Sequence, residues 1–112
     1  MKKLEIIIRP SRFEDVKQRL SDIGIHGMNY CDVQGFGRQH GHTEVYRGNT
    51  YEVDCLPKIR IDVVIHDEAL DKVLDAVYDA ACTGHTGDGK IFIYDVLDAM
   101  RIRTKERGPA TL

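Results

Sequence analysis

The apolar residues of the chain first form a short continuous run and then recur at helical spacing. The run Ile6-Ile7-Ile8 is β-branched and too short for a helix, so it predicts a strand over residues 3–9. Ser11 and Glu14 stand at the spacing of a capping box, which predicts a helix start, and Gly24 is a natural stop. The apolar positions of this helix are typical of a buried stripe: Phe13, Val16, Leu20 and Ile23.

The next two extended segments differ in polarity. Residues 28–36 are mixed, which favours a strand with one face against the core or a partner subunit. Residues 58–65 alternate strictly, which predicts one core face and one face toward water, ligand or another subunit. The core set is Ile59, Ile61, Val63 and Ile65, and the opposite set is Lys58, Arg60, Asp62 and Val64.

A second helix and a last strand complete the pattern. Asp67 and Glu68 favour a helix N-terminus, Gly84 closes the helix, and residues 91–96 favour a strand. The predicted buried stripe of this helix is Leu70, Val73, Leu74, Val77 and Ala81. The order β, α, β, β, α, β predicts a single α+β domain over residues 1–112 with a ferredoxin-like fold.

The gap between the second and third strands, about residues 37–57, is the most informative segment of the chain. Connections between paired strands usually take about 2 to 5 residues, and much longer structureless loops usually bind something. The gap contains glycines that let backbone approach a ligand, two cations (Arg38 and Arg47) and Tyr51 in a polar setting. These features predict a binding or signalling loop.

Composition narrows the functional classes. The 112 residues are 42% hydrophobic and 30% charged, as in soluble globular domains, and the net charge of -2 gives no overall attraction to nucleic acid or anionic membrane. The first residues fit neither a signal peptide nor a membrane span, so we expect a cytoplasmic protein without membrane insertion. Three widely spaced cysteines, Cys31, Cys55 and Cys82, fit reduced thiols.

An anion site must therefore be local, and two segments are candidates. In the loop of about residues 82–90, three closely spaced glycines permit a backbone that aims N–H groups at one anion, and Lys90 adds a charge. In the C-terminal segment of about residues 97–112, Arg101 and Arg103 would point the same way if the chain were extended, which suits a polyphosphate. The alternatives are a simple turn and a solvated basic tail.

Two other functional classes, RNA-binding modules and metal-binding modules, fit part of the sequence. Gly35-Phe36-Gly37 is similar to part of the aromatic motif of RNA-binding modules, but it ends the second strand instead of lying on the third. His40 and His42 suit a metal, but no third ligand is evident nearby, so loop histidines are the alternative. The motifs supply no activated nucleophile or paired acid and base, so we expect no enzyme.

Seven segments together resemble the PII nitrogen-regulatory signal transducers. They cover essentially the whole chain in the order that the family shows: Gly35-Phe36-Gly37-Arg38-Gln39, His42-Thr43-Glu44, Tyr46-Arg47-Gly48, Leu56-Pro57-Lys58, Thr83-Gly84, Gly87-Asp88-Gly89-Lys90-Ile91-Phe92 and Arg101-Ile102-Arg103-Thr104.

The resemblance implies a homotrimer with ATP or ADP bound competitively in the clefts between neighbouring subunits. It implies that Arg101 and Arg103 reach in from the adjacent subunit, and that Met28, Asn29 and Val64 border the base and ribose. The residues it implies for the nucleotide are Met28, Asn29, Gly35, Gly37, Arg38, Gln39, Val64, Gly87, Asp88, Gly89, Lys90, Arg101 and Arg103.

The resemblance also implies a second ligand. Gln39 would help coordinate magnesium beside the phosphates, 2-oxoglutarate would chelate that ion, Lys58 would pair with its distal carboxylate, and Gly87 would complete the 2-oxoglutarate site. A hard cation takes oxygen ligands and usually keeps phosphates in its shell, so the two ligands should couple positively.

The long loop is then the expected output. Tyr51 matches a tyrosine that is uridylylated in many bacterial members. The partners implied are ammonium channels, nitrogen-assimilation enzymes and a uridylyltransferase, with no nucleic acid. A regulatory protein that senses nucleotide alone is the alternative. Asn29, Thr86, Cys82 and His85 depart from the family's usual residues, and the first two border the expected base and ribose region, so they bear on nucleotide affinity and on the preference between ATP and ADP.

Overall fold

The computed structural model describes residues 1–36 and 55–112 in full, and the backbone alone of residues 43–46 and 49–52. The predicted βαββαβ order is confirmed, with a short hairpin inserted between its second and third strands. The elements are β1 (Lys2–Ile8), α1 (Phe13–Asp22), β2 (Asn29–Gly35), β3 (Thr43–Tyr46), β4 (Asn49–Glu52), β5 (Leu56–Ile65), α2 (Leu70–Ala81) and β6 (Gly89–Asp95).

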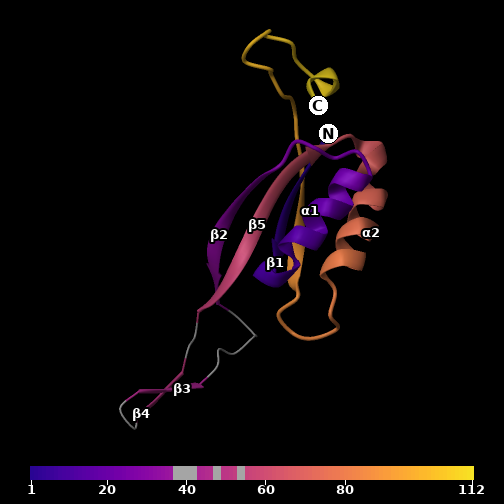
Figure 1. Ribbon diagram of the computed structural model, residues 1–112. Coiled ribbons are helices and arrows are strands. Elements are labelled where there is room, and N and C mark those ends of the chain that lie inside the picture. The colour runs from indigo at the N-terminus through magenta and orange to yellow at the C-terminus, as the bar shows by residue number, and fades with distance from the viewer. Residues whose placement is uncertain (37–42, 47–48, 53–54) are drawn as a thin grey trace.

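The four long strands form one antiparallel sheet in the order β2-β5-β1-β6. Leu4 is paired with Val63 of β5 and with Ile93 of β6, which fixes the register across the middle of the sheet. Both helices cover the same face (Figure 1). This is the ferredoxin-like α+β fold that the sequence predicts.

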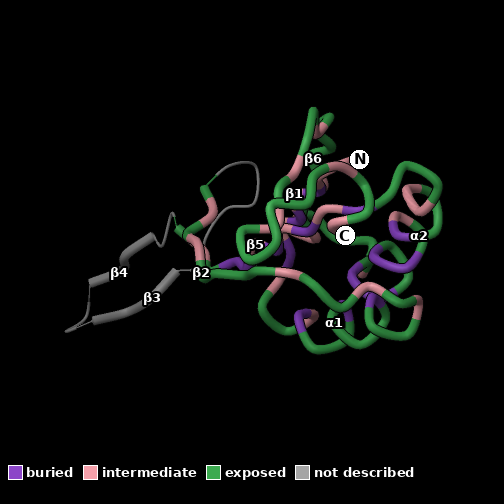
Figure 2. Tube along the Cα trace, turned by 90° about the horizontal axis from the view of Figure 1, so that it is seen from above, coloured by how far each residue is buried: buried purple, intermediate pink, exposed green. Residues whose placement is uncertain are grey.

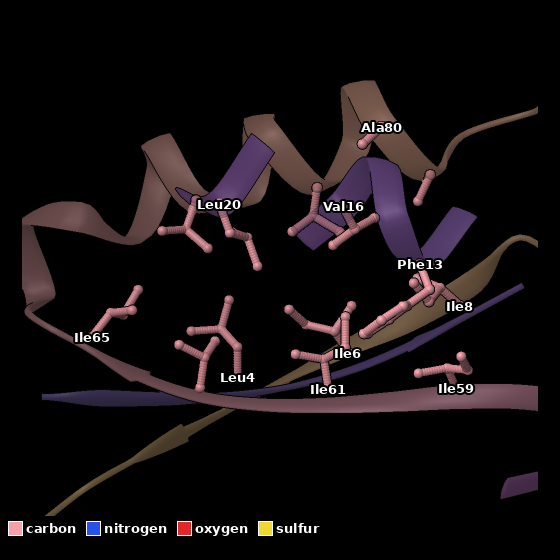
Figure 3. Close-up of a cluster of buried hydrophobic side chains, with 14 residues drawn as sticks. Leu4, Ile6, Ile8, Phe13, Val16, Leu20, Ile59, Ile61, Ile65 and Ala80 are labelled. Atoms are coloured by element: carbon pink, nitrogen blue, oxygen red, sulfur yellow. The ribbon is translucent and has the colours of Figure 1, made fainter. Parts of the chain in front are cut away.

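The core lies between the helices and the covered face of the sheet (Figure 3). Alternate residues of β1 and β5 point into it, as period-two patterning requires. The predicted stripe of α1 is confirmed at Phe13, Val16 and Leu20, and that of α2 at Val73, Val77 and Ala81. No helix of the described residues lies over the other face of the sheet (Figures 1 and 2).

The start of α1 differs from its prediction. A 3-10 turn, Pro10–Arg12, precedes the helix, and no side chain caps its N-terminus, so the capping box of Ser11 and Glu14 is wrong. Proline presets a helical φ, so the chain is already turning before Ser11 could act as a cap. The stop at Gly24 is confirmed: its φ is 89°, and its N–H donates to the carbonyl of Ser21 at 3.0 Å.

The long gap between β2 and β5 also differs from a structureless loop, because β3 and β4 pair as a hairpin with Tyr46 opposite Asn49. Two short β-prone runs separated by two residues are a recognised hairpin pattern. Elsewhere the predicted bounds hold within a few residues. In the described part of the chain no helix is long and apolar enough to cross a membrane, and the three cysteines are free thiols.

Candidate functional site

Two segments meet at one end of the sheet. Residues 82–90 comprise the loop between α2 and β6 and the first two residues of β6, and we call this segment the α2–β6 loop; it lies at the same end of the sheet as the start of β5 (Figure 1). The contact is direct, because Nζ of Lys58 donates a hydrogen bond of 2.6 Å to the carbonyl of Gly87. We call this end of the sheet the loop end, and the opposite end, where β1 begins and β6 ends, the far end.

The Asp88 carboxylate is the shared acceptor of the hydrogen bonds that hold the α2–β6 loop together. Its Oδ2 accepts hydrogen bonds from the N–H groups of Thr83 at 2.7 Å and Gly84 at 2.9 Å, and its Oδ1 accepts one from the Thr83 hydroxyl. The sequence predicts N–H groups aimed at an anion in this loop. The structure shows that two of them are aimed at the chain's own carboxylate.

Arg9, the residue directly after β1, joins two points of the same loop. Its Nε donates to Oδ1 of Asp88 at 3.1 Å, and its Nη2 donates to the carbonyl of Thr86 at 2.8 Å. The Thr83 hydroxyl and N–H, together with Arg9 and Gly84, hold the pKa of the Asp88 carboxyl well below its usual range. Asp88 is therefore an anion at neutral pH whose charge is compensated by Arg9 and by the hydrogen-bond donors of the loop.

Close backbone approach explains why glycine stands at the start of β6. Gly89 has a φ of 111°, and a Cβ at this position would lie 1.7 Å from the carbonyl oxygen of Ile7. Gly87 and Gly84 also have positive φ values, of 104° and 84°. The predicted glycine-dependent geometry of this loop is confirmed.

Lys58 is the one buried charged side chain in the described part of the chain. Burial lowers the pKa of its ammonium group, and the positive charge of Arg9 lowers it further. A Cβ at Gly35 would lie 3.0 Å from Cγ of Lys58, so glycine there leaves room for the lysine to reach Gly87. With the exposed Lys90, three cations and one carboxylate surround the loop end.

A second group of predicted site residues lies at the far end. Asn29 is paired with Asp62, whereas Gly35 is paired with Leu56 at the loop end. Val64 is six positions along β5 from Lys58, about 20 Å in an extended strand. Met28 precedes Asn29 directly, and the C-terminal segment leaves β6 at the same end (Figure 1). One chain therefore does not bring the two groups together.

The C-terminal arginines are arranged differently from the prediction. Residues 101–104 form a turn, closed by a 2.8 Å hydrogen bond from the N–H of Lys105 to the carbonyl of Arg101. Arg101 also donates to Oε2 of Glu106 at 2.9 Å, while Arg103 is exposed. The prediction that both guanidinium groups share one side of an extended segment is wrong, because this turn breaks the period of two.

Several predicted residues lie outside the described residues. These are Gly37, Arg38 and Gln39 of the nucleotide and magnesium set, and His40 and His42 of the metal alternative. Tyr51 lies in β4, of which only the backbone is described. In the rest of the described chain, no group of three or more His, Cys, Asp or Glu side chains is arranged to hold a metal ion.

Sequence reasoning missed the structural importance of Arg9 and Thr83. Arg9 directly follows β1 and Thr83 is the second residue after α2, so both lie where their side chains can reach Asp88. The signal that points to such a contact is a cation directly after one strand and a Gly-Asp-Gly turn at the start of the strand that pairs with it.

The fold and the loop end together define a ferredoxin-like domain with a glycine-rich loop that is contacted by the cations Arg9 and Lys58 and is fixed to the root of a long insertion. The chain belongs to the family of the nitrogen regulatory protein P-II, whose model matches residues 1–106. It is 55% identical to the nitrogen regulatory protein P-II of Haemophilus influenzae and 54% identical to that of Pasteurella multocida, each over 106 residues and 95% of both chains. It is 48% identical to the nitrogen regulatory protein P-II 1 of Escherichia coli over 112 residues and all of both chains. Membership of this family makes the protein a component of nitrogen-regulatory signal transduction.

Proposed function

We propose that the protein senses ATP or ADP together with 2-oxoglutarate, and that it reports their binding to partner proteins through the segment between β2 and β5. The observation that carries this proposal is the hydrogen bond from Lys58 to Gly87. It joins the residue two positions after the start of β5 to the middle of the α2–β6 loop. A ligand that occupies this point contacts both segments, and so can alter the long insertion that β5 follows.

The phosphates of the nucleotide would bind at the α2–β6 loop. Within the described chain, the N–H groups of Gly87 and Asp88 donate to no other residue, so they are available to phosphate oxygens. Lys90 supplies a point charge next to them, and Gly89 lets the ligand approach the backbone closely. Arg38 joins this set by the resemblance to the family.

The split of the candidate residues between two ends of the sheet supports a homotrimer. A complete nucleotide site would take the loop end of one subunit and the far end of its neighbour, with Arg101, Arg103, Met28, Asn29 and Val64 coming from the neighbour. Side chains on the uncovered face favour association. Phe92 and Tyr94 lie there, opposite Glu5 and Lys3 of β1, and are 44% and 48% exposed.

Lys58 would bind the distal carboxylate of 2-oxoglutarate, with Gly87 beside it. Magnesium would arrive on the ATP phosphates, with Gln39 as a further oxygen ligand, and 2-oxoglutarate would chelate it. The second site is then incomplete until ATP and magnesium are bound. Each ligand would raise the affinity for the other by the same factor.

The long insertion would be the output surface. Tyr51 is the candidate for uridylylation, and ammonium channels, nitrogen-assimilation enzymes and a uridylyltransferase are the candidate partners. Ligand contacts at Lys58 would change which conformations of the insertion are populated, as ligand contacts do in other proteins that switch by ordering a segment.

Calorimetric titration of 2-oxoglutarate, with and without ATP and magnesium, tests the sensor. Binding only in the presence of ATP and magnesium is expected, and no binding under either condition would refute the 2-oxoglutarate role. Light scattering should give three times the 12.7 kDa mass of the chain.

Mixing two variants tests whether sites are shared between subunits. Lys90→Ala removes a loop-end contact and Arg103→Ala a far-end contact, so each homotrimer should bind ATP poorly. In trimers reassembled from an equal mixture, about a quarter of the sites pair an intact loop end with an intact far end. Recovery of that fraction is expected, and no recovery would show that the site lies within one chain.

A nucleotide-only regulator is the second candidate, and one observation favours it. The Lys58 ammonium already donates to Gly87, and burial lowers its pKa, so its positive charge is less available to a carboxylate ligand than that of an exposed lysine. ATP binding that does not change on addition of 2-oxoglutarate would support this candidate.

A further inference from the structure

The α2–β6 loop is organised around an anion of its own. The Asp88 carboxylate accepts four hydrogen bonds, two from Thr83, one from Gly84 and one from Arg9. A fifth hydrogen bond joins the second donor nitrogen of Arg9 to the Thr86 carbonyl. Both Arg9 and Asp88 have side chains about one quarter exposed, 25% and 23%. The hydrogen bonds from Thr83 and from Nε of Arg9 to Asp88 are therefore partly buried, where charge-assisted hydrogen bonds are strong.

This arrangement conflicts with a direct role for the Asp88 carboxylate on phosphate. A carboxylate whose two oxygens already accept four hydrogen bonds has little capacity left, and its charge would repel a polyphosphate. The N–H groups of Thr83 and Gly84 are likewise already used. The N–H groups of Gly87 and Asp88 remain, and their direction depends on how the rest of the loop is held.

We propose that Arg9 and Asp88 are positioning residues, which hold the α2–β6 loop in the shape that receives the nucleotide phosphates, and that neither side chain is itself a phosphate ligand. The inference rests on the nucleotide site proposed above. Arg9 is suited to this task because one planar guanidinium group reaches two points of the loop, the Asp88 carboxylate and the Thr86 carbonyl. A lysine at this position has a single nitrogen and cannot reproduce both contacts in the same geometry.

Asp88→Asn separates a positioning role from a purely electrostatic effect, because the two predict opposite changes in ATP affinity. Removing a negative charge beside the phosphates should strengthen ATP binding if only charge matters. If Asp88 holds the loop, the variant should bind ATP about 10-fold more weakly, since the phosphate contacts lose their preorganisation. Asp75→Asn, on the exposed surface of α2, makes the same charge change away from the loop and should leave the affinity unchanged.

Arg9→Lys keeps the charge and removes the two-point contact. Calorimetry should show weaker ATP binding, again by about 10-fold, with a much smaller change for AMP, which lacks the outer phosphates. Arg19→Lys, on α1, is the matched control, because Arg19 is exposed and, among the described residues, its side chain makes only an ion pair of 3.8 Å with Asp79. Unchanged ATP affinity in Arg9→Lys, or tighter ATP binding in Asp88→Asn, would overturn the proposal.

Hydrogen exchange on the ligand-free protein tests the loop without relying on nucleotide binding. Amide exchange at Thr83 and Gly84 should be faster in both variants than in the wild type, because these N–H groups donate to Asp88. Wild-type exchange rates at both amides would overturn the positioning role. A wild-type protein that binds no ATP would instead refute the proposed nucleotide site and, with it, the functional half of this inference.

Discussion

Replacing Lys58 with methionine separates the two properties that this residue combines. Methionine has a similar length, so it keeps most of the packing of the lysine stem against Gly35, where a Cβ would lie only 3.0 Å from Cγ of Lys58. It removes the ammonium group and with it the 2.6 Å hydrogen bond to the Gly87 carbonyl. The change therefore isolates the contribution of one charge at the loop end.

The effect on stability should be small because two contributions oppose each other. Losing a hydrogen bond from a charged donor costs about 1.5 to 3 kcal/mol when the acceptor stays buried, but Gly87 is only partly buried and water can replace the donor. Removing a buried ammonium group recovers its desolvation penalty, which is the main cause of the lowered pKa of Lys58. We expect the free energy of unfolding to change by less than about 1 kcal/mol.

The effect on 2-oxoglutarate should be large. A charged hydrogen bond to the ligand carboxylate contributes about 1.5 to 3 kcal/mol, which corresponds to a loss of affinity of about 10- to 100-fold. The assay is titration of 2-oxoglutarate at saturating ATP and magnesium, with chemical denaturation measured alongside. Lys72→Met, on the exposed surface of α2, is the control for loss of one positive charge. An unchanged 2-oxoglutarate isotherm in Lys58→Met would refute the assigned role.

Three further predictions concern the packing and charge of the described chain. Gly89→Ala should destabilise the protein by at least about 3 kcal/mol in chemical denaturation, because its Cβ would lie 1.7 Å from the Ile7 carbonyl oxygen, and native stability would contradict the close approach. Leu20→Ala in the core should cost about 2 to 5 kcal/mol, whereas Ile102→Ala, 89% exposed, should cost little; equal losses would contradict the core assignment. The stability that the Asp88 carboxylate provides is present above its ordinary pKa of 3.8 and lost as the pH falls toward its lower folded pKa, so the gap between wild type and Asp88→Asn should narrow from pH 7 to pH 3, and a constant gap would exclude this linkage.

The sequence predicts the fold well because its apolar periods are regular. The alternation at Ile59, Ile61, Val63 and Ile65 has one structural solution, a strand with one buried face, and the structure has it. The predicted start of α1 was wrong for a local reason, since Pro10 begins a 3-10 turn where the capping box was expected. The hairpin of β3 and β4 was missed because the gap was interpreted by its length, its glycines and its charged and polar residues, and not by its short β-prone runs.

The candidate site was predictable in its residues but not in its connections. The three closely spaced glycines predict a tight backbone in this loop, and Gly84, Gly87 and Gly89 do have positive φ values. The contact of Arg9 with Asp88 joins residues 79 positions apart, and no periodic pattern reports such a distance. The turn at Arg101 was missed because it depends on a positive φ of 64° at Lys105, a conformation that lysine rarely adopts.

The α2–β6 loop is held at two separate points, and this separation matters for a sensor. Arg9, Thr83 and Asp88 fix its two ends to each other and to the end of β1, through hydrogen bonds in which Lys58 takes no part. Gly87, between them, is held by the Lys58 amino group. A carboxylate that takes this amino group would release the Gly87 carbonyl while the Asp88 contacts remain. In the proposed sensor, 2-oxoglutarate therefore changes the middle of the loop and the root of β5 together, and leaves the frame that holds the nucleotide phosphates in place.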